Sequence, residues 1–373
     1  MTPALPIMRK AIALILFGLL PVCSLLLVFG NARGDGIVTD FENIFYPAAE
    51  AVLHRSNPYP DVADPGVVAG TEYLYPPLPA LATSPFTALP SAAAGFVAMA
   101  LLVIAVFATL WVLRVRDWRC YGLALLWPPV ISAIQTGNVT IPLALGAALA
   151  WRYRDHAWTA GGSLGLTLAT KFFLWPLVLW LGFTRRIAAA ALAIGVGAVV
   201  LLASWAVIGF AGIDKYPDLL RRLQELEEGE GYTIYALALD LGFAQGAARA
   251  LWIGLAASLV AGIAVLGRRR DELRAFAVAI AAALACSPIV WLHYFALLLV
   301  VVAIAERSLG PSWFAPLAMY GSSGTKNGTT LQTALTIAAA ALTVALAVRP
   351  AWLNRPMSSD DELVAAADER PSV

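Results

Sequence analysis

Residues 120–151 read CYGLALLWPPVISAIQTGNVTIPLALGAALAW, an apolar run whose main interruption is Gln135-Thr136-Gly137-Asn138 near its middle. Crossing the ~30 Å hydrocarbon core of a bilayer takes about 20 helical residues. The run is therefore too long for one span and too short for two complete ones. We expect it to fold as two short helices that meet at a polar tip formed by residues 135–138.

Two further apolar runs have the same form. Residues 158–183 are interrupted by Thr170-Lys171, and residues 275–304 by Ser287-Pro288 and Trp291-Leu292-His293. Polar backbone at membrane depth is tolerated only where it lines protein or a water-filled cavity. We therefore expect the three polar tips to converge on one cavity near the outer face of the membrane.

The loops between these runs are short and basic: Arg114/Arg116/Arg119, Arg152/Arg154, Arg185/Arg186 and Arg268–Arg270/Arg274. Positive residues in short loops mark the cytoplasmic side of a membrane protein. Folding each long run as a helical pair keeps all four basic loops on that side. Arg9 and Lys10 precede the first apolar run, so the N-terminus is also expected in the cytoplasm.

The composition of the chain excludes a soluble protein. Its 373 residues are 60% hydrophobic and 13% charged, whereas soluble domains carry roughly 25% charged residues. Ordinary spans are expected at 11–30, 91–113, 187–209 and 247–266. We predict an all-α, multi-pass transmembrane bundle in the plasma (inner) membrane, with about 12 helical segments in the membrane, several of them short.

We expect one transmembrane domain, residues 1–350, followed by a disordered cytoplasmic tail at 351–373. Two long loops, 31–90 and 211–246, are expected outside the cytoplasm and to carry helices that lie along the membrane interface. Phe41–Leu53 has apolar residues at helical spacing, which favours such a helix. No feature of the charge distribution indicates a nucleic-acid partner.

Asp40 lies a few residues beyond the first span, in a loop rich in aromatic residues and proline. Desolvation at the membrane boundary would raise the pKa of its carboxyl group and make it a useful general base. The alternative is an ordinary helix N-cap. Asp35, between two glycines, is the competing carboxylate.

Lys171 and His293 are the other candidate catalytic residues. A charge inside an apolar run indicates a functional site by default, and the Lys171 ammonium could neutralise a lipid phosphate. Its alternative is snorkelling to the interface. His293 could bind phosphate or move protons, and its alternative is a satisfied core histidine.

Several polar and aromatic residues near these three are predicted to bind substrate. The amides of the first polar tip could hydrogen-bond sugar hydroxyl groups or cap the two helices that they join. The complete predicted set is Tyr46, Tyr59, Tyr75, Gln135, Asn138, Trp291 and Tyr294. The sequence has no glycine-rich phosphate loop, no zinc spacing and no D-x-D in either long loop, so we expect no cofactor and no divalent cation.

The motifs of the chain, taken in their order along the sequence, resemble those of glycosyltransferase family 87 over about residues 37–305. They are Asp40-Phe41, Tyr46, Ala49, Asn57-Pro58-Tyr59, Tyr75-Pro76-Pro77-Leu78, Gln135-Thr136-Gly137-Asn138, Lys171, Pro176, Ser287-Pro288 and Trp291-Leu292-His293-Tyr294. The family includes polyprenyl-phosphate-mannose-dependent α-1,2-mannosyltransferases. It often has paired histidines where this chain has His293 and Tyr294.

The resemblance implies the GT-C architecture and a hexosyltransferase active site outside the cytoplasm. Asp40 would be the general base of an inverting transfer of a hexose, with mannose as the first candidate. The donor would be a polyprenyl-phosphate sugar and the acceptor a glycolipid or polysaccharide. Lys171 and His293 would offset charge on the departing phosphate. A lipid or polyol transporter, or flippase, is the alternative.

Overall fold

The computed structural model describes residues 4–31, 40–70 and 72–349, and every regular element in these ranges is a helix. The predicted all-α fold class is confirmed. The predicted tail at 351–373 and the competing carboxylate Asp35 lie outside the described residues.

The helices of the first half are α1 (Ala4–Leu14), α2 (Leu20–Asn31), α3 (Tyr46–Leu53), α4 (Pro65–Ala69), α5 (Pro77–Thr83), α6 (Ser91–Val112), α7 (Trp118–Leu125), α8 (Pro128–Thr136) and α9 (Thr140–Arg152). Those of the second half are α10 (Ala157–Thr170), α11 (Pro176–Phe183), α12 (Ile187–Val207), α13 (Tyr216–Glu227), α14 (Ile234–Asp240), α15 (Gln245–Arg268), α16 (Glu272–Cys286), α17 (Leu298–Ala305) and α18 (Thr330–Ala347). Short π and 3₁₀ turns join or extend them: η1 (Ile15–Leu19), η2 (Phe41–Phe45), η3 (Ser84–Ala88), η4 (Phe172–Leu174), η5 (Leu292–Leu297), η6 (Pro311–Trp313) and η7 (Ala315–Gly321).

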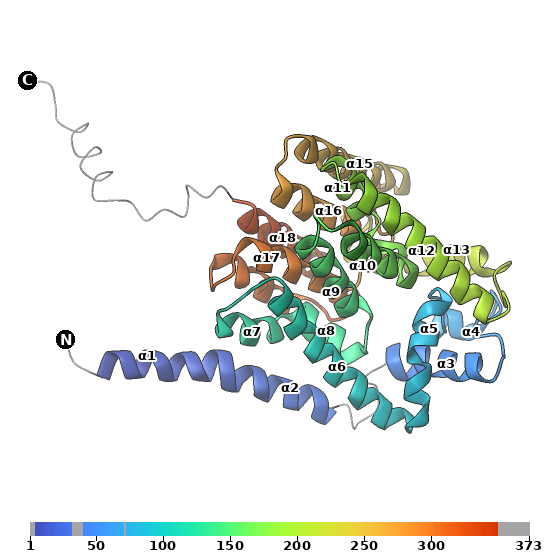
Figure 1. Ribbon diagram of the computed structural model, residues 1–373, viewed down its shortest axis with the longest axis horizontal. Helices are drawn as coiled ribbons and strands as arrows, with labels where there is room; N and C mark the ends of the chain where they lie inside the picture. Colours follow the sequence, from blue (N-terminus) through green and yellow to red (C-terminus); the bar gives the residue numbers. More distant parts are fainter. Residues whose placement is uncertain (1–3, 32–39, 71, 350–373) are drawn as a thin grey trace, which may run out of the picture.

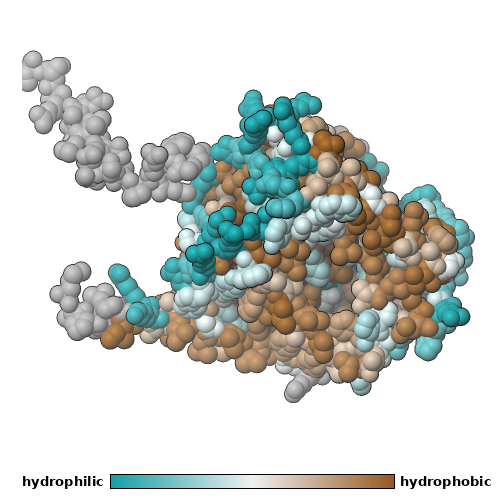
Figure 2. Space-filling view, viewed as in Figure 1, coloured by the Kyte–Doolittle hydropathy of each residue, from teal (hydrophilic) through white to brown (hydrophobic). Residues whose placement is uncertain are grey.

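Five of the described helices are long and apolar enough to span a bilayer: Ile7–Gly30, α6, α12, α15 and α18. Four of them match the ordinary spans predicted from the sequence. The bent pair α8 and α9 would make a sixth span if counted together. The predicted number of about 12 membrane segments is not confirmed, because the remaining helices are too short to be spans on their own. Figure 2 shows a broad hydrophobic belt, with hydrophilic residues gathered toward two edges of the molecule.

The apolar run 120–151 does break at its polar tip. Gly137 ends α8 in the left-handed conformation, with φ +70°, which glycine adopts without the steric cost that other residues meet. The chain turns by 119° between α8 and α9. The predicted breaks in the other two runs are also present: Lys171 is extended between α10 and η4, and Ser287 is extended after α16.

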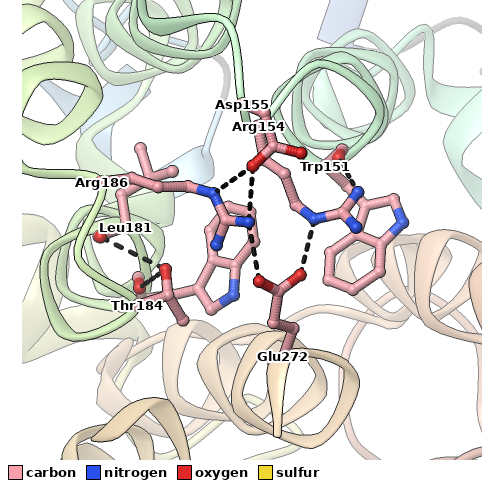
Figure 3. A network of polar contacts seen from close by, with 8 residues as sticks. Trp151, Arg154, Asp155, Leu181, Thr184, Arg186 and Glu272 are labelled. Carbon is pink, nitrogen blue, oxygen red and sulfur yellow. Dashed lines mark hydrogen bonds and ion pairs between the residues drawn. The ribbon is translucent and has the colours of Figure 1, made fainter. Parts of the chain in front are cut away.

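Two of the basic loops, those with Arg154 and Arg186, meet at the start of α16. Figure 3 shows the Glu272 carboxylate between two arginines that come from different interhelical loops. It accepts from Arg154 Nε and from Arg186 Nη2, each at 2.7 Å. Arg186 also pairs with Asp155 at 2.7 Å. One acidic residue at the start of α16 thus joins the α9–α10 and α11–α12 loops.

Further polar contacts extend this network across the rest of the bundle. Arg274 Nε donates to the Val348 carbonyl oxygen at the end of α18, at 3.1 Å. Arg349 pairs with Glu306 after α17, at 2.8 Å. Asp117 accepts from a backbone N–H of the loop that follows Glu306, at 3.1 Å. We call this set of contacts, together with those of Glu272, the basic face.

The polar tips lie at the opposite ends of the helices that start or end at the basic face. α9, α10 and α16 contain 13, 14 and 15 residues, so each is about 20 Å long at 1.5 Å per residue. Their far ends adjoin Asn138, Lys171 and Ser287, respectively. Figure 1 shows the helices of the first long loop, α3, α4 and α5, grouped at one end of the molecule near α13.

The first long loop is helical where the sequence predicted a helix. η2 and α3 together cover Phe41–Leu53. Phe41, Phe45 and Tyr46 are buried, and their rings contact other aromatic rings of the loop, as in the pair Phe41–Phe86 with centroids 5.7 Å apart. This packing fixes the position of Asp40, which directly precedes η2.

Candidate active site

Asp40 is buried, with 8% of its surface exposed, and directly precedes η2. Its side chain makes no capping hydrogen bond to that helix. Oδ2 instead accepts from Asn138 Nδ2 at 2.5 Å. The carboxylate thus reaches the first polar tip, 98 residues further along the chain, so the N-cap alternative does not describe its contacts.

Burial raises the pKa of the Asp40 carboxyl group, because the ionised form loses its hydration. The hydrogen bond from Asn138 and the positive charge of Lys171 act in the opposite direction. The raised pKa has the sign that a general base needs if it is to hold a proton near neutral pH.

Lys171 points its ammonium group into the molecule, among aromatic rings. Nζ hydrogen-bonds the hydroxyl of Tyr294. It lies 4.0 Å from the ring centre of Tyr294, 5.0 Å from that of Tyr75 and 5.9 Å from that of Phe173. Such rings attract a cation through their negative faces. These contacts disagree with the snorkelling alternative.

His293 is fully buried, and neither ring nitrogen has a hydrogen-bond partner among the described residues. The indole nitrogen of Trp291 is likewise buried without a partner. The imidazole packs against Tyr294 and Trp291, with ring centres 4.8 Å and 5.7 Å away. A satisfied core histidine would have its nitrogens paired, so that alternative does not fit. Buried polar nitrogens without a partner indicate a place for a polar ligand.

The segment before His293 is held by two loops from elsewhere in the chain. Tyr232 N donates to the Val290 carbonyl oxygen at 2.7 Å, and Leu292 N donates to the Thr325 carbonyl oxygen at 3.0 Å. The Tyr232 hydroxyl also donates to the Lys326 carbonyl oxygen at 2.8 Å. The loops after α13 and before α18 therefore set the position of the imidazole.

The structure brings together the acidic, ammonium and imidazole groups that the sequence singled out. Asn138 joins Asp40 to Tyr75, whose hydroxyl lies 3.4 Å from Asn138 Nδ2. The Tyr75 ring faces Lys171, and Lys171 contacts Tyr294 beside His293. The three polar tips and the first long loop therefore meet in one cluster, which we call the candidate site.

Three of the predicted substrate-binding residues lie at the edge of this cluster or outside it. The Tyr46 hydroxyl donates to the Leu89 carbonyl oxygen at 2.8 Å. The Tyr59 hydroxyl donates to the carbonyl oxygen of Tyr75 at 2.9 Å, and its ring stacks on Trp205. Gln135 is half-buried on α8 and makes no side-chain hydrogen bond to a described residue.

Sequence reasoning missed Thr140 and Phe173. Thr140 contacts the Asn138 amide through both its backbone N–H and its hydroxyl. An Asn two residues before a Thr at a helix start is the available signal, because both side chains cap helices. Phe173 offers no signal of its own, since one aromatic residue in an apolar run is ordinary.

An apolar cavity of about 340 Å³ lies between α15, α16 and α18. None of the predicted site residues lines it. In the part of the chain that the structure describes, no group of three or more His, Cys, Asp and Glu residues could hold a metal ion.

A comparison with known families decides what kind of protein carries this site. The model of glycosyltransferase family 87 matches residues 73–290, more than half of the chain. The chain belongs to glycosyltransferase family 87. Membership, together with the apolar helices, makes it a membrane glycosyltransferase. No curated protein and no solved structure matches the chain.

The family match covers only part of the candidate site. Tyr75, Asn138 and Lys171 lie within residues 73–290. His293 lies three residues beyond the end of that range, and Asp40 lies 33 residues before its start. The spatial contacts described above are what connect these two residues to the matched core.

Proposed function

We propose that this family 87 protein transfers a hexose, with mannose as the first candidate, from a polyprenyl-phosphate sugar to a glycolipid or polysaccharide acceptor. The observation that carries the proposal is the meeting of buried Asp40 with Lys171 and His293 at three helix breaks. A base beside a cation and free hydrogen-bonding groups is the arrangement that glycosyl transfer from a phosphate requires.

In the proposed reaction, an acceptor hydroxyl attacks the anomeric carbon and its proton passes to the Asp40 carboxylate. The bond between the anomeric carbon and the phosphate oxygen breaks, and its electron pair leaves with the lipid phosphate. Attack opposite the leaving group inverts the configuration. Lys171 would offset the charge that grows on the phosphate, and the unpaired nitrogens of His293 and Trp291 would hydrogen-bond it.

The site is proposed to open to the extracytoplasmic side of the plasma membrane, with both termini in the cytoplasm. Two observations support this orientation: the basic face lies at one end of α9, α10 and α16, and the candidate site at the other. Short basic loops favour the cytoplasm. The reaction as proposed uses no cofactor and no divalent cation.

The test is sugar transfer by the purified protein in liposomes that contain polyprenyl-phosphate-[¹⁴C]mannose and a lipid glycoside acceptor. Asp40→Asn keeps the side chain's shape and removes the base, so we expect turnover to fall by about 10²–10⁴-fold. Asp61→Asn is the matched control, because Asp61 is an exposed carboxylate of the same loop. Full activity of Asp40→Asn would falsify the assignment of the base.

The same liposomes test the alternative function. A transporter or flippase would move the labelled lipid from one leaflet to the other without forming a new glycosidic bond. Chromatography of the extracted lipids separates the two outcomes, because only a transferase yields a labelled product larger than the acceptor.

A further inference from the structure

Asn138 is completely buried, and protein groups occupy both ends of its side-chain amide. Oδ1 accepts from the backbone N–H of Thr140 at 3.0 Å and from the Thr140 hydroxyl at 2.7 Å. Nδ2 donates to Asp40 Oδ2 at 2.5 Å and lies 3.4 Å from the Tyr75 hydroxyl. The amide is therefore already engaged on both sides, which leaves little capacity for a sugar hydroxyl.

The orientation of this amide follows from its partners. An amide offers an acceptor at one end and two donors at the other. The backbone N–H of Thr140 can only donate, so it requires the oxygen end. A reversed amide would place its NH₂ against that N–H and its oxygen against the Asp40 carboxylate, and both contacts would be repulsive. Thr140 thus fixes which group Asn138 presents to Asp40.

The backbone around Asn138 is also fixed. Asn138 N donates to the Ala133 carbonyl oxygen at 2.9 Å, and Gly137 N donates to the Ile134 carbonyl oxygen at 3.2 Å. Together these bonds close the end of α8 around the left-handed Gly137. The amide is then carried by a tight turn between two helices, which is a more rigid support than a free loop.

We propose that Asn138, held by Thr140, is a positioning residue for the Asp40 carboxylate. It holds Oδ2 of Asp40 and leaves Oδ1 of Asp40 free to receive the acceptor's proton. This inference rests on the proposed role of Asp40 as the base. It gives Asn138 a different task from the sugar binding that the sequence suggested. Asn138 acts through Asp40 and touches no reacting atom.

Electrostatics supports the same role. Among the influences on Asp40, the hydrogen bond from Asn138 is the largest that lowers the carboxyl pKa against the effect of burial. Loss of that donor should raise the pKa further. The pH dependence of turnover then reports on Asn138, whereas a residue that only stabilises the fold would leave it unchanged.

The experiment measures kcat, KM and the pH profile in the liposome assay for Asn138→Ala and Asn138→Asp. For Asn138→Ala we expect kcat to fall by about 10- to 100-fold, as for a lost hydrogen bond to a charged group. The acidic limb of the pH profile of kcat should move to higher pH for this variant, while KM for both substrates stays within about threefold of the wild-type value. Asn138→Asp places a second carboxylate beside Asp40 and should move that limb further.

A second pair of variants covers the case in which Asn138 variants fail to fold. Thr140→Val keeps the side chain's shape but removes the hydroxyl that holds Asn138 Oδ1, whereas Thr140→Ser retains it. We expect Thr140→Val to lower kcat by a fewfold and to shift the acidic limb in the same direction. Thr140→Ser should behave like the wild type.

Two results would overturn the inference. An Asn138→Ala enzyme with unchanged kcat and acidic limb, but a raised KM for one substrate, would make Asn138 a sugar-binding residue. Equal pH profiles for Thr140→Val and Thr140→Ser would remove the role of the Thr140 hydroxyl, because the backbone N–H of residue 140 is present in both variants. If Asp40→Asn is inactive in the same assay, such a result overturns only the inference; if Asp40→Asn is fully active, the base assignment on which the inference rests falls, and if the wild type forms no labelled glycoside, the proposed function falls.

Discussion

The two ends of α9, α10 and α16 differ in how their charged side chains are paired. At the basic face, the Glu272 carboxylate lies between two arginines, and one of these also pairs with Asp155. At the candidate site, Lys171 forms no ion pair with a described carboxylate, and its ammonium rests among aromatic rings. The ring nitrogens of His293, in the same cluster, have no hydrogen-bond partner among the residues that the structure covers.

The difference distinguishes a stabilising network from a site prepared for a ligand. The charges of the basic face have counter-ions, although Arg186 Nη1 and Arg349 Nε are buried without a hydrogen-bond partner among the described residues. A buried charge without a counter-ion is costly to the folded protein, and a bound anion would relieve that cost. Perturbed and unpaired ionisable groups of this kind gather at functional sites.

Of the variants that test this difference, Lys171→Gln is expected to have the largest effect on turnover. Without the ammonium, the leaving phosphate loses its charge stabilisation, and turnover should fall by about 10²–10³-fold. Thermal unfolding in detergent should be unchanged or shifted to higher temperature, because an unpaired charge leaves apolar surroundings. Both quantities can be measured on the same preparation.

Lys215→Gln is the control for that variant. Lys215 pairs with Asp61 at 2.5 Å, but both side chains are more than half exposed, so the pair contributes little. Retained turnover with a lowered melting temperature in Lys171→Gln would mean that Lys171 is a structural residue.

Glu272→Gln probes the other end of the molecule. It leaves two arginines without their shared counter-charge, and we expect the free energy of unfolding to fall by about 2 kcal/mol, between the values for exposed and buried pairs. Turnover per folded molecule should not change. Asp155→Asn, which removes only an exposed partner of Arg186, should cost less than about 1 kcal/mol. Loss of turnover without loss of stability in Glu272→Gln would contradict the separation of the two ends.

The last prediction concerns the pH dependence of the wild-type protein. Asp40 must be ionised to accept a proton, and its pKa is raised above 3.8. Turnover should therefore fall about tenfold per pH unit below the raised pKa. The folded state binds this proton more tightly than the unfolded chain does, so the contribution of Asp40 to stability decreases as the pH rises from about 4 through the raised pKa.

Turnover and melting temperature measured over the same pH range test both predictions: turnover should fall as the pH is lowered, and the contribution of Asp40 to stability should fall as the pH is raised. Asp40→Asn should abolish the contribution of this residue to the pH dependence of stability. An acidic limb of turnover that lies at the ordinary pKa of aspartate would show that burial does not govern the base in the working enzyme.

The positions of the helix breaks could be predicted from the sequence. Lys171 and the amides of residues 135–138 interrupt apolar runs that are longer than one span, and arginines mark the loops at the opposite ends. The meeting of these tips follows from the cost of polar backbone in hydrocarbon. Such arguments use composition and length, which do not depend on the packing of individual side chains.

The partners of individual side chains could not be predicted in this way. Nothing in the sequence shows that the Tyr46 hydroxyl bonds the Leu89 carbonyl, or that Phe173 joins the rings around Lys171. These contacts depend on rotamers and on how segments far apart in the chain pack together. The number of membrane segments is equally difficult to predict, because broken and short helices have fewer residues than the length needed to span the hydrocarbon core.

The length of α9, α10 and α16 has a consequence for how substrates arrive. These helices are about 20 Å long, whereas the hydrocarbon core is about 30 Å thick. If the basic face lies at one membrane surface, Asp40 is recessed by about 10 Å from the other surface. A sugar carried on a lipid reaches that depth by lateral diffusion within the leaflet, whereas a water-soluble nucleotide sugar would have to descend into the bilayer.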